Sequence, residues 1–218
     1  MKIKWPNCST RVLFDASTRG VVLFKPMQFL CIGLGNHGDE YDNTRHNVGF
    51  AVLDRFSKEW TTDKYLFGDV AKVKVGTHSA LLLKPSTFMN KSGLAAVAAR
   101  KASAIPDKRI IVIHDDLDLP LGSMKIVFDR GSGGHRGVES VVHSLKTQAF
   151  IRVRLGISPT TPSGKLKKPK GDAAVQKFIL GTFSPKELLV FKKATKRAQE
   201  AIELLITDGL ERAMNEFN

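Results

Sequence analysis

The sequence has few cysteines and no long uncharged apolar run, and each shortage excludes a class of protein. Its 218 residues include only Cys8 and Cys31, too few for a disulfide framework or a cysteine-based metal site. No segment approaches the roughly 20 uncharged apolar residues that a membrane-spanning helix needs, so we expect a soluble protein with no membrane partner. Because 42% of the residues are hydrophobic, a chain of this length can bury one sizeable core, which predicts a single domain.

Acidic residues are also scarce relative to basic ones. The chain has 34 Lys and Arg against 21 Asp and Glu, which gives a net charge of +13. Part of the surplus is local, because ten basic residues and only two acids lie between Ser163 and Arg197. Such a charge indicates a polyanionic partner, nucleic acid or a membrane surface, although a merely basic soluble protein would also show it.

The first 28 residues differ in composition from the rest. They contain five basic residues, interspersed Ser and Thr, and a single acid, Asp15. This composition is typical of a mitochondrial targeting segment, so we expect residues 1–28 to be an extension and residues 29–218 to form the domain. The alternative is an ordinary basic tail on a cytoplasmic protein.

Strand-like and helix-like patterns alternate along residues 29–218. Apolar or alternating segments predict strands, and a four-residue period, as in Val48, Val52, Phe56 and Trp60, predicts a helix. This order predicts one α/β sheet with helices on both faces, whose ligands gather at the carboxyl ends of the strands. The expected strands are 29–34, 71–75, 80–83, 110–113, 124–128 and 151–157, and the expected helices are 48–60, 86–104, 138–146 and 186–206.

A glycine motif follows the first expected strand. Gly33, Gly35 and Gly38 have the spacing of a dinucleotide-binding loop. Such a loop should open a helix directly, but residues 39–44 are polar and helical periodicity resumes only at Val48. We therefore expect no nucleotide cofactor.

Two further motifs carry a histidine and carboxylates. His46 lies in a polar loop before a helix, where an imidazole can act as a base or be merely solvated. Asp115 follows the strand 110–113, where a carboxylate can orient a histidine, bind a metal or face water. No set of His, Asp and Glu with metal-ligand spacing accompanies it, so we expect no metal site.

Asn90 and the glycine-rich residues 131–137 are also candidates. Asn90 can donate its amide to a peptide or to a developing oxyanion, or it can cap a helix. The glycine-rich segment opens a predicted helix, so it can cradle a phosphate or serve as a flexible connector.

These and other motifs occur in one order between Phe29 and Asn218. They are Gly-Leu-Gly-Asn at 33–36, Tyr41, Thr-Arg-His-Asn at 44–47, Phe-Met-Asn at 88–90, His-Asp-Asp-Leu-Asp at 114–118, Gly-Gly-His at 133–135, Arg-Val-Arg-Leu-Gly-Ile at 152–157 and Phe-Ile-Leu-Gly at 178–181. Together they closely resemble the bacterial-type peptidyl-tRNA hydrolase family. The resemblance implies a monomeric three-layer α/β/α fold around a mixed sheet, without metal or cofactor. It also implies hydrolysis of the ester joining a peptide to the terminal ribose of tRNA, so peptidyl-tRNA is the expected partner.

The resemblance assigns catalytic roles to four residues. His46 would take a proton from the attacking water, and Asp115 would hold it in the right tautomer without a covalent nucleophile. Asn36 and Asn90 would bind the peptide backbone and share the charge of the oxyanion.

It also implies contacts with the substrate and with tRNA. Arg154, supported by Lys125, would meet a tRNA phosphate, and the lysine-rich residues 163–171 would add affinity that does not depend on RNA sequence. Tyr41 and Met89 would line the cleft. The full set of expected substrate-binding residues is Tyr41, Asn47, Phe88, Met89, His135 and Arg136.

Three positions depart from the family pattern. Arg136 stands where asparagine is usual, so a hydrogen-bond acceptor is lost and a charge is gained, which would suit a phosphate or the terminal adenine. Val127 replaces a lysine, which weakens the expected phosphate clamp with Arg154, and His37 replaces a proline. The departures keep one alternative open, namely an RNA-binding relative without hydrolase activity that assists intron splicing in organelles.

Overall fold

The computed structural model describes residues 12–13, 22–23 and 28–218. Before Gln28 it gives only the short antiparallel pair of β1 (Val12–Leu13) and β2 (Val22–Leu23). The predicted targeting segment therefore falls almost entirely outside the described residues, and its role stays a prediction.

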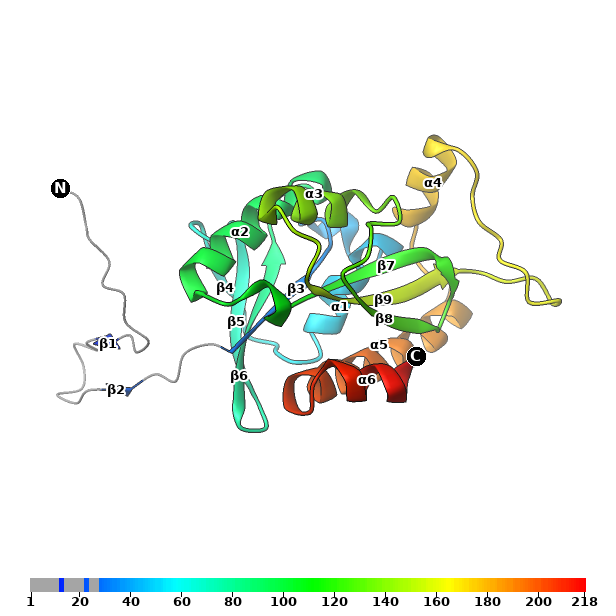
Figure 1. The fold of residues 1–218 in the computed structure, drawn as a ribbon. Coiled ribbons are helices and arrows are strands. Elements are labelled where there is room, and N and C mark those ends of the chain that lie inside the picture. Colours follow the sequence, from blue (N-terminus) through cyan, green and yellow to red (C-terminus); the bar gives the residue numbers. More distant parts are fainter. Residues whose placement is uncertain (1–11, 14–21, 24–27) are drawn as a thin grey trace.

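A seven-stranded mixed sheet forms the middle of the molecule (Figure 1). In the order in which they lie across the sheet, its strands are β4 (Thr61–Asp63), β5 (Gly68–Val75), β6 (His78–Pro85), β3 (Phe29–Gly33), β7 (Ile110–Pro120), β9 (Ile151–Ser158) and β8 (Met124–Phe128). The four central strands β6, β3, β7 and β9 are parallel, and the strands nearer the two edges are antiparallel to their neighbours.

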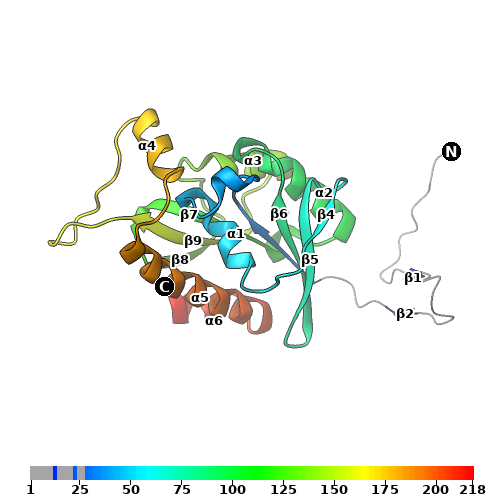
Figure 2. The same cartoon turned by 180° about the vertical axis from the view of Figure 1, so that it is seen from behind.

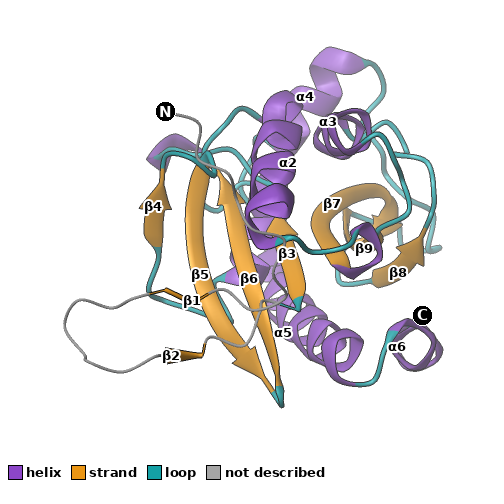
Figure 3. Cartoon of the chain, turned by 60° about the vertical axis from the view of Figure 1, so that its left-hand side comes forward, coloured by secondary structure: helices purple, strands orange, loops and turns teal. Residues whose placement is uncertain are grey.

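Helices cover both faces of this sheet, as Figures 2 and 3 show. One face carries α2 (Ser92–Ser103) and α3 (Arg136–Leu145), and the other carries α1 (Val48–Leu53), α5 (Pro185–Thr207) and α6 (Leu210–Phe217). Each face has its own buried core, because successive residues of a strand point to opposite sides: Leu30 and Ile32 join the α2–α3 core, whereas Cys31 joins the other. The predicted three-layer α/β fold is confirmed.

The remaining helices are short. Four 3-10 turns, η1 (Asp39–Tyr41), η2 (Arg45–Asn47), η3 (Met89–Lys91) and η4 (Asp107–Arg109), lie in connections between the main elements. α4 (Asp172–Ile179) stands apart from the layers, beyond the ends of β7 and β9, and has no buried residue (Figures 1 and 2). Among the described residues, no helix has the length and apolar character needed to cross a membrane.

The predicted helix over residues 48–60 is too long. α1 ends at Leu53, and the chain then folds back instead of continuing the helix. The indole of Trp60 packs against the core and its Nε1 donates a 3.0 Å hydrogen bond to Asp54 Oδ1. The apolar period therefore arose from two separate segments that bury their side chains on the same face.

The strand predicted to end at Ile113 is too short. It continues as β7 to Pro120, because β9 pairs with it as far as Asp116 and, after a register shift, again at Pro120. Asp115 consequently lies within a strand rather than after one, which restricts its backbone more than a loop would.

Two glycines draw the segment before α1 onto the sheet. A Cβ at Gly49 would lie 2.3 Å from Leu34 N and 2.5 Å from Ile113 O, and one at Gly33 would lie 2.5 Å from Gly49 O. Only a residue without a side chain allows backbones to approach so closely. Because η2 directly precedes α1, these contacts bring His46 within reach of β7.

Candidate active site

The carboxyl ends of three adjacent parallel strands meet at one edge of the sheet. The chain leaves β6 at Pro85 and β3 at Gly33, and β7 reaches Asp115 just beyond its last pair with β3. Segments distant in sequence therefore converge at this edge, which is where ligands bind in open α/β sheets.

His46 and Asp115, 69 residues apart in sequence, are in direct contact at this edge. His46 Nδ1 lies 2.8 Å from Asp115 Oδ1, and both residues are buried. Burial alone would raise the pKa of Asp115, but His46 and His135 hold the pKa of this carboxyl well below its usual range. An ionised carboxylate can only accept hydrogen bonds, so the proton of His46 is on Nδ1 and its Nε2 has a free lone pair.

A second histidine contacts the same carboxylate oxygen. His135 Nε2 lies 3.0 Å from Asp115 Oδ1, whereas the family resemblance implied only a substrate-binding role for His135. Its Nδ1 accepts hydrogen bonds from the backbone N–H groups of Gly137 and Val138, at 3.1 and 3.3 Å, and thereby caps α3. Because an accepting ring nitrogen carries no proton, Nε2 is the donor to Asp115. In the sequence, the Gly-Gly-His motif before a helix marked His135 as a candidate site residue, but it did not indicate that His135 bonds Asp115.

These three side chains also have the composition of a small metal site. One ligand atom from each of His46, Asp115 and His135 lies within 4.8 Å of the others. A metal bound at Nε2 of His135 would displace the proton there while Nδ1 still accepts from two backbone groups, which would leave the ring without any proton. The set therefore suits a hydrogen-bonded catalytic group better than a resident metal ion.

His114 supports Asp115 from the backbone side. Its Nδ1 donates to the carbonyl oxygen of Asp115 at 2.7 Å, and its ring centroid lies 4.7 Å from that of His135. Burial, together with the proximity of His135, keeps the pKa of His114 well below its usual value. A neutral His114 adds no positive charge that would compete with His46 for the carboxylate.

Asn36 is held at the site by Asn47. Asn47 Oδ1 accepts from Asn36 N at 2.8 Å, and Asn47 Nδ2 donates to Asn36 O at 2.9 Å. This buried amide therefore positions Asn36, and the substrate-binding role predicted for Asn47 stays a prediction. Asn36 Oδ1 accepts from Met89 N at 3.1 Å, so its Nδ2 is the end left to donate to a ligand.

The other predicted substrate contacts differ in how far they are exposed. Asn90 and Arg136 are exposed, and Phe88 is 69% exposed. Met89 is buried beside Asn36, and Tyr41 is half-buried in η1. Of these residues, Met89 is linked to the site directly, because its backbone N–H donates to Asn36 Oδ1.

The predicted phosphate contacts lie on β8 and β9. Lys125 and Arg154 are directly opposite each other on the two strands, and Arg154 Nε lies 2.5 Å from Asp116 Oδ2. Val127 is buried and faces Arg152, which is also buried. Val127 offers no polar group to a phosphate, and the weaker clamp that its side chain implies stays a prediction.

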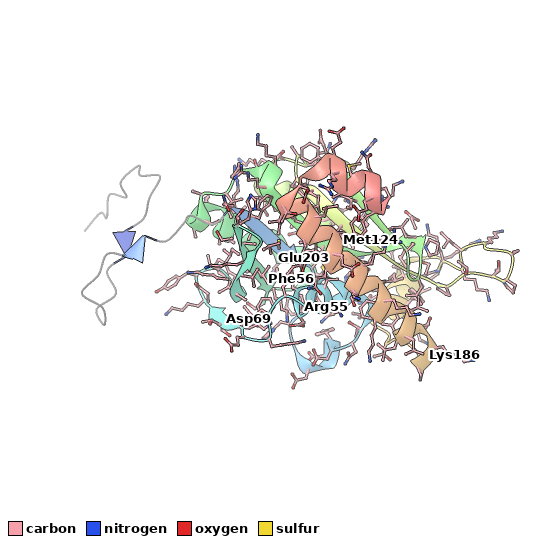
Figure 4. The ribbon with its side chains drawn as sticks, turned by 90° about the horizontal axis from the view of Figure 1, so that it is seen from below. Arg55, Phe56, Asp69, Met124, Lys186 and Glu203 are labelled. Atoms are coloured by element: carbon pink, nitrogen blue, oxygen red, sulfur yellow. The ribbon has the colours of Figure 1, made fainter. Side chains whose placement is uncertain are left out.

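A cavity of about 660 Å³ lies on the face of the sheet that α5 and α6 cover. Figure 4 labels three of its lining residues, Arg55, Phe56 and Glu203. None of the predicted site residues and no histidine lines this cavity, so it is separate from the group around Asp115.

Comparison with known proteins shows which family the chain resembles. A family model described as peptidyl-tRNA hydrolase matches residues 30–218. The chain belongs to the peptidyl-tRNA hydrolase family. The fold, the motifs and the expected class of hydrolytic enzyme all agree with this membership.

Relatives and solved structures support the family over most of the chain. The peptidyl-tRNA hydrolase of Thermosynechococcus vestitus is 39% identical over 191 residues, which cover 86% of this chain and 92% of the relative. That of Fervidobacterium nodosum is 40% identical over 190 residues, 87% of this chain and 95% of the relative. The crystal structure of peptidyl-tRNA hydrolase from Acinetobacter baumannii has a TM-score of 0.79 and 30% identity, and covers 88% of this chain and 94% of its own. Nothing in these comparisons favours the splicing alternative.

Proposed function

We propose that this chain hydrolyses the ester bond of peptidyl-tRNA, releasing the peptide and free tRNA, with His46 as general base. The observation that carries the proposal is the 2.8 Å contact between His46 Nδ1 and Asp115. It fixes the tautomer in which Nε2 of His46 can accept a proton, and no other described side chain is bonded to that nitrogen.

The reaction needs one proton acceptor and no covalent intermediate. Nε2 of His46 takes a proton from water as the water oxygen attacks the ester carbonyl. Asp115 stays ionised, because its pKa is low, and stabilises the imidazolium that forms. The same proton then passes to the departing ribose oxygen, so the products are a carboxylic acid and an alcohol and His46 is neutral again.

Two side-chain amides stabilise the negative charge that develops on the carbonyl oxygen of the substrate. The free Nδ2 of Asn36 and the exposed amide of Asn90 donate hydrogen bonds to the peptide backbone and to the carbonyl oxygen as it becomes negative. One such preorganised donor contributes about 3 kcal/mol, or roughly a hundredfold in rate.

Basic side chains beside β8 and β9 form the surface that receives tRNA. Lys125 is exposed opposite Arg154, and Lys168 forms an ion pair with Asp118 near the end of the strand that carries Asp115. The neighbouring lysines of the loop before α4 are exposed as well: Lys165, Lys167 and Lys170. Such a surface binds RNA phosphates with an affinity that falls as salt rises.

We further propose that the enzyme acts as a monomer in mitochondria. The catalytic group is assembled within one chain, which supports a monomer. The basic, hydroxyl-rich composition of residues 1–28 supports import into mitochondria.

The deciding experiment is hydrolysis of N-acetyl-aminoacyl-tRNA by the wild-type protein and two variants. His46→Ala should lower kcat by about a hundredfold or more, since it removes the base. Asp115→Asn should lower kcat by about a thousandfold with little change in tRNA affinity, since it removes the charge that stabilises the imidazolium. His143→Ala, at an exposed histidine of α3, is the matched control and should keep full activity.

Retained turnover in His46→Ala would remove the assigned base. An equal loss of tRNA binding and turnover in Asp115→Asn would show that the carboxylate acts on binding instead of chemistry.

A further inference from the structure

We propose that Arg130 and Arg136, which lie on either side of the glycine-rich residues 131–135, bind the RNA phosphates nearest to the scissile ester. The inference rests on the proposed hydrolase function and specifies how this chain holds the 3′ end of its substrate. Neither arginine belongs to the predicted clamp of Lys125 and Arg154.

Among the arginines that the structure describes, these two are distinguished by guanidinium groups without a partner. Both are exposed, and no hydrogen bond, ion pair or aromatic contact involves their side chains. The guanidinium groups of the other described arginines contact acids, amide or carbonyl oxygens or aromatic rings: Arg45, Arg55, Arg100, Arg109, Arg152, Arg154, Arg197 and Arg212.

The backbone that carries the two arginines is anchored at both ends. The buried Arg152 donates from Nη2 to the carbonyl oxygens of Arg130 and Gly131, at 3.0 and 2.8 Å. At the other end, His135 bonds both Asp115 and the backbone N–H groups of α3. An anchored loop loses less conformational freedom when it binds a ligand, so the arginines are preorganised.

The residues between them leave space for a polynucleotide backbone. A Cβ added at Gly131, Gly133 or Gly134 would meet no atom within 4 Å, so this stretch presents bare main chain to solvent. Two free guanidinium groups around such a surface suit phosphodiesters, because a guanidinium binds phosphate oxygens through two parallel hydrogen bonds.

The position relative to the reaction indicates which phosphates are bound. Arg136 directly follows His135, whose Nε2 is 3.0 Å from the Oδ1 of Asp115 that also holds His46. The ester is on the terminal ribose, and the 5′ oxygen of that ribose carries the first phosphodiester, one sugar away from the reacting carbon. Arg136 therefore lies beside the last phosphates of the single-stranded 3′ end, and with Arg130 it supplies charge that the buried Val127 does not.

The test compares two substrates in the full chain carrying Arg130→Gln and Arg136→Gln together. One substrate is N-acetyl-aminoacyl-tRNA, and the other is the N-acetyl-aminoacyl ester of adenosine, which keeps the ester and the base but has no phosphate. With tRNA we expect kcat/KM to fall about tenfold, and the slope of log(kcat/KM) against log salt to shrink by about 1.4, because each single-strand phosphate contact contributes about 0.7. With the adenosine ester we expect a change of less than about twofold, which also shows that the variant is folded.

The matched control removes the same charge from the opposite face of the sheet. Lys192→Gln with Lys193→Gln changes two exposed lysines of α5 and should alter neither substrate's kcat/KM nor the salt slope. An equal effect in this control would mean that overall charge, rather than the two arginines, governs binding.

Two results with the arginine variant's turnover would overturn the inference. One is an unchanged kcat/KM for tRNA, and the other is an equal loss with the adenosine ester, which would assign the arginines to chemistry or base recognition. Binding of uncharged tRNA, measured by fluorescence anisotropy in the same variants, tests the contact independently of turnover. If the wild type hydrolyses neither substrate, the proposed function fails, while unchanged tRNA affinity in the arginine variant would separately refute the phosphate contact.

Discussion

A single residue, Asp115, orients three histidines, two through its carboxyl group and one through its backbone carbonyl. Oδ1 of Asp115 accepts from His46 and His135, and its backbone carbonyl accepts from His114. Each contact selects a tautomer, because the acceptor is an oxygen in every case and the ring nitrogen must donate. Two ring nitrogens are left unprotonated and without a partner, Nε2 of His46 and Nε2 of the fully buried His114, and we assign the chemistry to the first of them.

The buried His114 should make stability depend on pH. Its folded-state pKa lies well below that of the unfolded chain, so below about pH 6.5 the unfolded state binds a proton that the folded state excludes. The free energy of unfolding should therefore be highest above that pH and fall as the pH drops. One such group contributes a slope of up to about 1.4 kcal/mol per pH unit.

The variant His114→Asn isolates this effect. Its amide can donate to the Asp115 carbonyl as Nδ1 does, but it does not titrate. Urea unfolding between pH 5 and pH 7 should show a flatter pH dependence in the variant than in the wild type. Parallel curves for the two proteins would mean that His114 is not the group responsible.

At the scale of elements, Arg45 joins the turn that carries His46 to the segment between α4 and α5. Its guanidinium lies 4.5 and 5.1 Å from the ring centroids of Phe178 and Phe183, and its Nη2 lies 3.0 Å from Glu187 Oε2. Glu187 also closes the capping box of α5 with Ser184. One arginine thus connects the catalytic turn η2 to the start of α5 and the end of α4.

Arg45→Ala should loosen this junction. Because the ion pair is largely buried and lies between aromatic rings, we expect a loss of about 2 kcal/mol in the free energy of unfolding, between the values for exposed and for fully buried pairs. Hydrogen exchange should rise in α4 more than in the central strands. Arg212→Ala, which breaks an exposed pair with Asp208 within the last helices, is the control and should cost less than about 0.5 kcal/mol. A loss in Arg45→Ala no larger than in this control would contradict the proposed connection.

At the scale of the whole molecule, positive charge lies on both faces of the sheet. Lys165 and Lys167 are exposed on the loop between β9 and α4, whereas Lys186, Lys192 and Lys193 are exposed on α5, where Figure 4 labels the first of them. Net charge alone therefore does not locate the RNA surface. It is the neighbourhood of Asp115 that favours the β8–β9 side.

The N-terminal extension permits a separate prediction, because every residue that we propose to be catalytic lies after it. In the full chain, Arg11→Glu with Arg19→Glu should reduce mitochondrial import, since acidic residues are disfavoured in targeting segments. Hydrolysis by the purified variant should be unchanged. Cell fractionation measures the first outcome, and Lys192→Glu with Lys193→Glu is the control for added negative charge. Undiminished import of the arginine variant would contradict the targeting role.

Sequence patterns predicted most strands and helices but not all of their ends. The runs around Leu30 and Ile111 read as buried strands because both faces of the sheet are covered. The ends of β7 and α1 depended on partners far away in the chain, namely β9 and the core beneath Trp60. Hydrophobic periodicity carries no information about such distant partners. The predicted helix at α1 was therefore too long, and the predicted strand at β7 too short.

By itself the sequence determined the alternation of elements, through local pattern, and the family, through motifs in a recognisable order. The resemblance to that family in turn implied that Asp115 holds His46. Only the tertiary structure decided that His135 shares the carboxylate, that Asn47 braces Asn36, and that Arg130 and Arg136 are left without partners. These are contacts between side chains whose distance in space has no trace in their spacing along the chain. They are set by strand order, by the close approach of glycine backbones and by which nitrogen of a ring is already bonded.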